Sequence, residues 1–363
     1  MLLILSVLCI LLLLLYLRRK YGTLEKMGIP VIKPGLCLGS EPLMIHETNY
    51  PEWDMENTRK YGKVWGSYAI SEPWITVGDP NLIRAILVKD HQSHFPCHSI
   101  EIGQKQFRTL DISKGDEWRD LRKGLSPTFT SGKIKGMLDL LEDSVDNMIE
   151  HLDEVTQKNP VVDVKYIFQA MALDVIAKCA FGIESNSFKN PDNTIFKHGR
   201  KIFEDFRITN ITTSIFIQIF FTVDFLAKYL DVTSPSFRDL WNLTRSVQAE
   251  RAKLGTTTGD FIDRLNELNE KWKKGEFPSL SSEQITGQGI IFIAAGFETT
   301  SNTLSTLCYN LAKHPDVLDN LITEVDQVFD KFDGVVNHET ISEMPFLEAC
   351  IKVIWLMSAL HFL

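Results

Sequence analysis

The sequence lacks the features that mark several classes of protein. Its six cysteines contain no C-x-x-C pair and follow no regular framework, which argues against a disulfide scaffold and indicates a reducing compartment. No basic stretch is interleaved with aromatic residues, and the net charge is −9, so we expect no nucleic-acid partner. Internal repeats and low-complexity tracts are also absent. The 363 residues leave room for one large folded domain or two smaller ones.

The N-terminus departs most from average composition. Residues 2–17 are almost purely apolar, and Arg18, Arg19 and Lys20 follow at once. A cleaved signal peptide would instead place its charges before the apolar run and end at small residues. The pattern therefore predicts a retained signal-anchor over residues 1–20, in the endoplasmic reticulum membrane, with the bulk of the chain on the cytoplasmic side. The run is shorter than the roughly 20 residues of an ordinary span, but that bilayer is thin and flanking cations snorkel.

A connector rich in proline and glycine follows over residues 21–45. Pro30 and Pro34, close to two glycines, make it stiff and non-helical. Residues 63–68 and 74–80 then have the composition of two short strands, the second ending in a turn. These patterns predict a small β-sheet near the N-terminus.

Helical periodicity dominates from about residue 80 onward. Apolar residues recur at intervals of three and four in four segments, residues 81–89, 116–125, 132–155 and 164–181. A much longer helix is predicted from Ser281, a plausible N-cap, to Lys313, where His314-Pro315 stops it. Its centre, residues 290–295, is apolar all round, which predicts a helix through the middle of the molecule. The fold class is therefore mainly α with a small β-sheet near the N-terminus.

The long helix carries polar residues directly after its apolar centre, in the run Ala295-Gly296-Phe297-Glu298-Thr299-Thr300. A carboxylate there is buried or lines a cavity, and burial without a partner is costly. Gly296 allows a flat ligand to approach the backbone, and Thr299 bonds back to a carbonyl one turn earlier. Acid, hydroxyl and a trapped water would form a short proton relay. The alternative, which spacing alone favours, is a helix kink with a satisfied Glu and Thr pair.

A second group of polar residues lies in the segment 116–125. Trp118 and Arg122 are four apart and share one face of a helix, where an indole N–H and a guanidinium together suit a carboxylate. A surface salt bridge beside a packed tryptophan is the alternative reading. A metal site is not expected: His91, His94, Cys97 and His98 lie close together in sequence, but Pro96 breaks any shared helical face.

Several motifs in order give the chain its resemblance to a known family. It resembles the cytochrome P-450 haem-thiolate monooxygenases, in particular the animal microsomal branch with the family-three enzymes, over residues 1 to about 352. The motifs that carry the resemblance are residues 60–66, Glu117 to Lys133, Asp174-Val175-Ile176, Ala180-Phe181-Gly182, the Ala-Gly-Phe-Glu-Thr-Thr run and His314-Pro315-Asp316-Val317. The resemblance implies an oxidoreductase that inserts one atom of O2 into a lipophilic small molecule.

The resemblance also implies a cofactor, partners and roles for matching residues. The cofactor would be haem b. Trp118 and Arg122 would contact a haem propionate, and Ala295 and Gly296 would lie over the distal face. Glu298 and Thr299 would be the catalytic residues of proton delivery. Electrons would come from NADPH through a cytochrome P-450 reductase. The apolar residues 215–221 fall where family members dip a surface into the membrane, and Gln218 argues against a second span.

The sequence departs from the family after Lys352. Val353 and Leu356 stand where the family carries Glu-x-x-Arg, and residues 353–363 form an apolar tail unlike the family. No cysteine lies in the context of the proximal haem ligand. We therefore expect residues 46–352 to form a partial, C-terminally truncated cytochrome P-450 domain that is inactive by itself. The alternative is a non-catalytic, membrane-anchored fragment without haem, or a splice or gene-model artefact.

Overall fold

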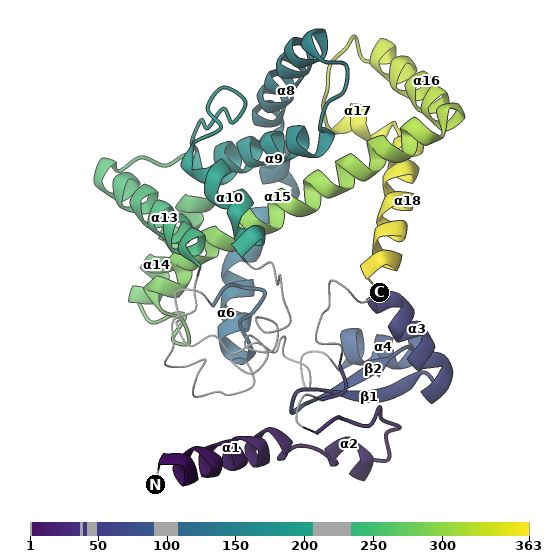
Figure 1. Ribbon diagram of the computed structural model, residues 1–363. Helices are drawn as coiled ribbons and strands as arrows, with labels where there is room; N and C mark the ends of the chain where they lie inside the picture. The colour runs from purple at the N-terminus through teal and green to yellow at the C-terminus, as the bar shows by residue number, and fades with distance from the viewer. Residues whose placement is uncertain (1, 37–38, 42–48, 91–107, 206–233, 363) are drawn as a thin grey trace. The chain divides into compact units, whose positions relative to one another are not determined.

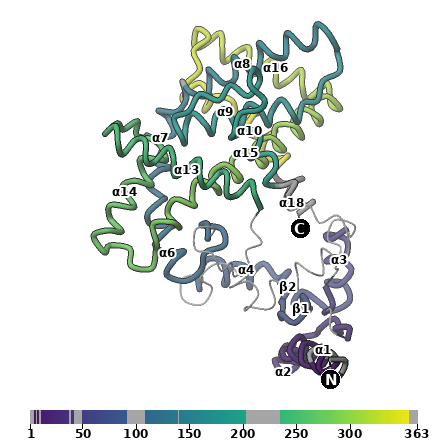
Figure 2. Tube along the Cα trace, turned by 60° about the vertical axis from the view of Figure 1, so that its left-hand side comes forward, coloured from purple at the N-terminus to yellow at the C-terminus, as the bar shows by residue number. Residues whose placement is uncertain are grey.

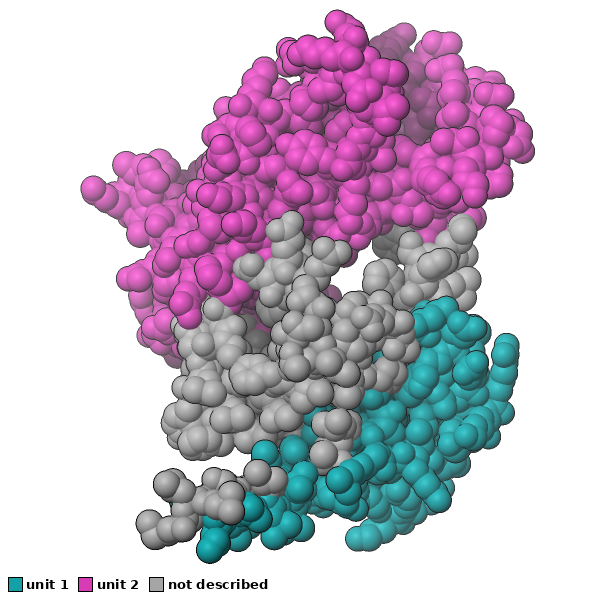
Figure 3. Space-filling view, in the orientation of Figure 1, with its two compact units in different colours: residues 1–103, 207–231, 360–363 teal, residues 104–206, 232–359 magenta. Residues whose placement is uncertain are grey.

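The computed structural model describes residues 2–36, 39–41, 49–90, 108–205 and 234–362. The chain divides into two compact units (Figure 3). The first comprises residues 1–103, 207–231 and 360–363, and the second comprises residues 104–206 and 232–359. The His and Cys residues at 91–98, where no metal site is expected, and the apolar membrane patch predicted at residues 215–221 lie outside the described residues.

The first unit contains the predicted small sheet. Its strands β1 (Val64–Ala69) and β2 (Glu72–Val77) pair antiparallel, with Val64 opposite Val77 and Ala69 opposite Glu72. The connector runs beside β1, since Val31 forms a parallel bridge to Gly66. The unit's helices are α1 (Leu2–Arg18), α2 (Thr23–Lys26), α3 (Tyr50–Tyr61), α4 (Pro80–Arg84) and the π-helical turn η1 (Ala85–Lys89). A mainly helical chain with a minor sheet near its N-terminus is therefore confirmed.

Helix α1 coincides with the segment predicted to be a membrane anchor. It has 17 residues, and most of the side chains whose burial the structure describes are exposed, whereas Leu17 is buried. Within the described ranges, none of the helices combines the length and the apolar character that a bilayer crossing needs.

The remaining elements form an all-helical assembly in which α15 has a central place (Figures 1 and 2). Helices α9, α10, α13 and α14 all pack against it. The elements in chain order are α6 (Gly115–Leu125), η3 (Ser126–Phe129), α7 (Ser131–Lys135), α8 (Leu138–Lys158), α9 (Val164–Phe181), α10 (Thr194–Asp205), α13 (Pro235–Leu254), α14 (Phe261–Lys273), α15 (Ser282–Lys313), α16 (Pro315–Lys331), α17 (His338–Ser342) and α18 (Pro345–Phe362).

The two helices that matter most for function begin and end as predicted. The Ser281 hydroxyl accepts a hydrogen bond from the Gln284 N–H at 3.2 Å and caps α15, and Pro315 starts the next helix. Helix α9 ends at Gly182, which adopts the left-handed conformation with a φ of 60°. The single helix predicted over residues 132–155 is wrong, because a turn at Gly136 separates α7 from α8. Glycine is a poor helix former, and periodicity alone did not register the break.

Helix α15 is central along its first half only. Residues 284–290 are all buried, among them the two glutamines Gln284 and Gln288. Beyond them one face opens, and Ala295, Thr299 and Thr300 are exposed. The prediction of a helix through the middle of the molecule is therefore confirmed for the N-terminal turns, and one face of the rest is uncovered.

A buried ionic cluster ties three of the helices together. The Arg251 guanidinium near the end of α13 contacts Asp260 at 2.6 Å and Asp263 at 3.1 Å, both at the start of α14. It also donates to the Phe181 carbonyl at the end of α9 at 2.7 Å. Burial opposes the charge on Arg251, but the two carboxylates outweigh it and raise the pKa of the guanidinium. The cluster therefore fixes the ends of α9, α13 and α14 against one another.

Candidate functional site

Two buried glutamines of α15 fix the segment that leads into α6. The Gln288 Oε1 accepts a hydrogen bond from the Leu110 N–H at 2.8 Å, and its amide nitrogen donates to the Arg108 carbonyl at 3.3 Å. One turn earlier, the Gln284 amide donates to the same carbonyl at 3.3 Å and to Glu117 at 3.4 Å. Buried amides of this kind are expensive to leave unpaired, so they hold the start of α6 in register with α15.

Helix α14 holds the other end of α6. The Arg264 Nε donates to the Gly124 carbonyl at 2.7 Å. A Cβ on Gly124 would lie 2.4 Å from Cδ2 of Leu268, so a larger residue would force the Leu268 side chain to shift. Ser279 adds a hydrogen bond to Asp120 at 2.5 Å. The position of α6 relative to α15 is therefore set from both ends by side chains that sequence motifs alone did not single out.

Trp118 and Arg122 lie one turn apart on this fixed helix. Trp118 is half-buried and Arg122 is exposed. Among the described residues, no carboxylate forms an ion pair with Arg122, although its neighbour Arg119 pairs with Asp116 at 2.5 Å. The surface salt bridge considered for Arg122 from the sequence is therefore not observed. Its guanidinium is available to an external anion.

Ala295 and Thr299 form an open face on α15. The Thr299 hydroxyl donates to the Ala295 carbonyl at 2.6 Å, as predicted. Both residues are exposed, one turn apart on the same side. The helix continues through this bond from Ser282 to Lys313. The hydroxyl donates its one proton to the carbonyl, and its lone pairs are left to accept from a water or a ligand.

Glu298 is directed to a different neighbour. Its carboxylate accepts from the Lys165 ammonium at 2.8 Å and from the Gln169 amide at 3.2 Å, both on α9. Asn302, one turn along α15, adds a bond at 3.3 Å. The structure therefore shows the satisfied Glu that was the alternative reading. Glu298 and Thr299 are neighbours in sequence, but the structure does not bring their side chains together.

Gly296 allows a close approach between two helices. A Cβ at this position would lie 2.8 Å from Cδ1 and 3.1 Å from Cγ1 of Ile176 on α9. From the sequence, the missing side chain was expected to make room for a flat ligand. In the structure the Ile176 side chain fills that space. Ile176 is the last residue of the Asp174-Val175-Ile176 motif.

Two features of the described residues are accessible to a ligand. Arg122 offers a cation that pairs with no described carboxylate, and the Ala295–Thr299 face offers an uncovered helix surface. Of the cysteines that the structure describes, burial raises the pKa of Cys179, Cys308 and Cys350. An iron-ligating thiolate needs the opposite shift. None of the described side chains forms a cluster of three or more ligands able to hold a metal ion.

Comparison with known proteins places the chain in one class. The family model that matches is described as Cytochrome P450, and the match covers residues 29–352. The chain is 30% identical over 354 residues to cytochrome P450 3A7 of Homo sapiens, covering 94% of this chain and 68% of that protein. It is 31% identical over 355 residues to cytochrome P450 3A29 of Sus scrofa, with the same coverage.

These matches show that the chain belongs to the cytochrome P450 family, whose members are haem-dependent monooxygenases. The resemblance to the family-three branch is confirmed as well. The match to the family model ends at residue 352, the residue after which the sequence departs from the family's pattern.

Four side chains that organise the site could not be identified from sequence motifs. They are the α15 glutamines Gln284 and Gln288, and the α9 residues Lys165 and Gln169. Both pairs are four apart, so each shares a helix face, and that spacing was the only signal in the sequence. It does not say which partner each face meets.

Proposed function

We propose that this protein inserts one oxygen atom into a lipophilic small molecule on the open face of α15. One observation carries the proposal. The helix is buried all round over residues 284–290 and then exposes Ala295 and Thr299. A helix surface that carries a small side chain, Ala295, beside the Thr299 hydroxyl is suited to a flat cofactor and a small substrate.

Haem b is the cofactor that this arrangement would hold. Arg122 and Trp118 would contact a propionate, because a guanidinium and an indole N–H are both donors and one is charged. The Ala295–Thr299 face would lie over the distal side. When bound, haem supplies the activation of O2, with electrons from NADPH through a reductase partner. The protein's part is to orient, to exclude water and to deliver protons.

Thr299 is the residue proposed to order the proton donor. Because its hydroxyl hydrogen is committed to the Ala295 carbonyl, its oxygen presents lone pairs to a water on the open face. Glu298 would take up a proton from solvent and pass it to that water. Its carboxylate is held by Lys165, so it must leave the ammonium before it can reach the Thr299 side. Gly296 contributes by letting Ile176 of α9 pack closely against this turn of α15.

Attachment to the endoplasmic reticulum membrane completes the proposal. The exposed leucines of α1 and the basic residues Arg18 and Arg19 at its end support association with a lipid surface whose headgroups are anionic. Residues 215–221 would add a second apolar contact. A lipophilic substrate and a membrane-bound reductase would both be concentrated at that surface.

Haem binding is the step to measure first, because Val353 and Leu356 occupy the Glu-x-x-Arg positions of the family. Haem is titrated into the full chain in lipid or detergent, and the reduced carbon-monoxide difference spectrum is recorded. We expect Arg122→Gln to weaken haem binding about tenfold, as loss of one charge-assisted bond does. Arg119→Gln, on the same helix but already paired with Asp116, is the matched control.

Turnover tests the role of Thr299. Thr299→Val removes the hydroxyl at nearly constant volume, and we expect product formation to fall with the haem spectrum unchanged. Thr300→Val, at the next and equally exposed position, should leave turnover intact. Failure of the parent chain to bind haem at all would reject the proposal and support the non-catalytic fragment.

A further inference from the structure

Strand β2 lies at an edge of the small sheet in the first unit (Figure 1). The opposite side of β1 is occupied by the connector, since the Gly66 N–H donates to the Pro30 carbonyl at 2.8 Å and the Ile32 N–H donates to the Gly66 carbonyl at 2.9 Å. Among the described residues, no strand or bridge pairs with β2 on its outer side. The described sheet therefore ends at β2.

The register of the sheet determines which backbone groups of β2 point outward. Backbone groups alternate between the two sides of a strand, and those of Gly66 are bonded to the connector. Ile75 is opposite Gly66, so its N–H and carbonyl point away from β1. The same holds for Pro73 and Val77, two residues to either side. The outer edge therefore offers the N–H groups of Ile75 and Val77 and the carbonyls of all three residues, because proline has no N–H.

The side chains of β2 are uncovered as well. Trp74 is 54% exposed and Ile75 is 45% exposed, on opposite faces of the strand. Proteins usually protect such an edge with a lysine, a bulge or a covering segment. Glu72 is the charged residue of β2, and it is paired with Lys20. The edge therefore presents apolar side chains and outward backbone groups without an unpaired charge that would repel another strand.

The outer edge of β2 is complementary to itself. When two β2 strands run antiparallel with their Ile75 residues opposite each other, each Ile75 N–H meets the Ile75 carbonyl of the other copy. Each Val77 N–H then meets the Pro73 carbonyl of the other copy. The N–H that proline lacks is missed at the end of the strand, next to exposed Gly78, where water reaches the Val77 carbonyl. Every outward N–H of the edge therefore finds an acceptor.

The same register covers the exposed side chains. On one face of the joined sheets, Ile75 lies against Ile75 of the second copy. On the other face, Trp74 lies opposite Thr76 of the second copy, in a position where side chains approach closely. Contacts between aromatic and β-branched residues in such pairs stabilise antiparallel sheets.

We propose that the chain forms a two-fold symmetric dimer through antiparallel pairing of two β2 strands, which joins the two sheets into one. A contact of one strand with another is smaller than the roughly 1,200 Å² of a standard interface, so the association is reversible and depends on concentration. The surface belongs to the first unit and contains no residue of the proposed haem face. The dimer therefore does not depend on the proposed monooxygenase function.

Opposite charges at position 75 test the register. Ile75→Lys and Ile75→Glu each alter an exposed side chain, so each variant should fold as the parent does, but each places like charges opposite each other in the dimer. Sedimentation equilibrium of the full chain in density-matched detergent measures the association. We expect each variant alone to dimerise about tenfold more weakly than the parent. An equimolar mixture of the two should regain most of the lost affinity, because lysine then faces glutamate.

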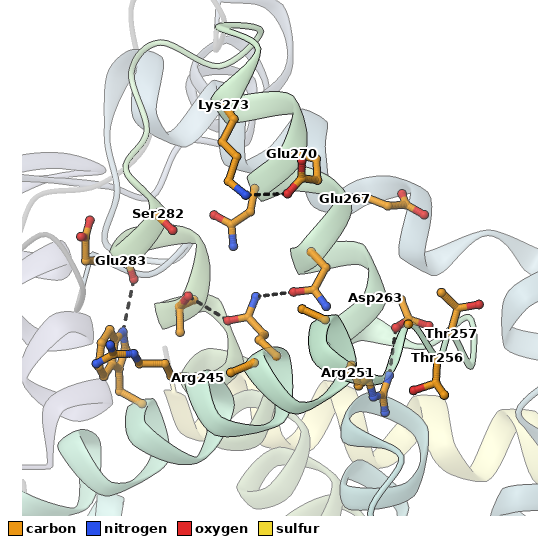
Figure 4. Close-up of a pocket in the computed structure, with 18 residues that line it drawn as sticks. Arg245, Arg251, Thr256, Thr257, Asp263, Glu267, Glu270, Lys273, Ser282 and Glu283 are labelled. Carbon is orange, nitrogen blue, oxygen red and sulfur yellow. Dashed lines mark hydrogen bonds and ion pairs between the residues drawn. The ribbon is translucent and has the colours of Figure 1, made fainter.

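Two variants control for net charge. Leu82→Lys adds the same charge at an exposed apolar residue of α4, away from the edge. Lys273→Met removes a charge from α14 and breaks the exposed pair with Glu270 that is drawn in Figure 4. Both variants should dimerise with the parent's affinity. A tenfold loss in either would show that net charge, and not the β2 edge, governs the association, and would overturn the proposal.

Amide hydrogen exchange locates the contact within the chain. Exchange at Ile75 and Val77 should become slower as the concentration of the parent rises, and should stay fast in Ile75→Lys. The proposal is overturned if the parent is monomeric at every concentration, or if Ile75→Lys dimerises with unaltered affinity. It is also overturned if these two amides are protected at every concentration, because the chain's own residues would then cover the edge.

Discussion

Lys165 on α9 holds the carboxylate of Glu298 on α15, with 2.8 Å between the ammonium nitrogen and Oε1. The two residues are 133 positions apart in the chain, and the pair crosses the interface at which α9 supports the central helix. The acid expected to deliver protons is therefore held by a cation on a neighbouring helix. The consequences of this contact, and of three others, can be measured.

The Lys165–Glu298 pair should contribute little to stability. The Lys165 side chain is 47% exposed, so solvent screens the attraction, and we expect a coupling free energy of about 0.2–1 kcal/mol. A double-mutant cycle with Lys165→Met and Glu298→Gln, measured by urea unfolding, gives this value. A coupling well above that range would mean that the pair is more desolvated than the structure shows. Lys189→Met, which breaks a pair with Glu150 exposed on both sides, is the control.

The Arg251 cluster, by contrast, should contribute strongly to the free energy of unfolding. Arg251→Met leaves Asp260 and Asp263 buried without their cation, and we expect a loss of about 3–5 kcal/mol in the free energy of unfolding. Adding Asp260→Asn should recover part of the loss, because one uncompensated charge is removed. Lys273→Met, which breaks an exposed pair on α14, should have no measurable effect.

Gly296 should be required for helix packing. Gly296→Ala drives a methyl group into Ile176, and we expect it to destabilise the chain by about 1–3 kcal/mol, less the gain in helix propensity. Ile176→Val removes the Cδ1 atom that the new methyl group meets, so the double variant should regain most of the stability. Thermal unfolding followed by circular dichroism measures both. A double variant no more stable than Gly296→Ala would contradict the packing role.

Tyr50 should make the first unit sensitive to high pH. Its phenol is partly buried and donates to the Glu41 carboxylate, and burial first and Glu41 second raise its pKa well above the ordinary value of 10.0. A raised folded-state pKa means that this stabilisation is fully present below pH 10.0 and is lost as the pH rises towards the folded value.

The free energy of unfolding should therefore fall above pH 10.0 in the parent and fall less in Tyr50→Phe. Near neutral pH the variant should be less stable by about 0.5–1.5 kcal/mol, the worth of one hydrogen bond. Near-ultraviolet circular dichroism follows the transition through the adjacent Trp53–Trp65 pair, whose rings meet edge to face. Identical pH profiles for the two proteins would show that Tyr50 is not the titrating group.

The sequence was sufficient for features that depend on neighbours along the chain. The limits of α9 and α15 follow from a cap at one end and a glycine or proline at the other, all within a few residues. The Thr299–Ala295 bond is equally local, because a hydroxyl in a helix reaches only the carbonyl one turn back. The family could also be identified from the sequence, because its motifs occur in a specific order along the chain.

The tertiary structure decided which helix faces meet. The sequence shows a glycine at position 296, but only the packing of α9 shows that Ile176 fills the space beside it. Spacing showed that Trp118 and Arg122 share a face of α6. Only the contacts of Gln284, Gln288 and Arg264 show what holds the two ends of that helix. Glu298 is the clearest case: its charge and its place in the motif are written in the sequence, whereas its partner depends on an interface between segments 133 residues apart.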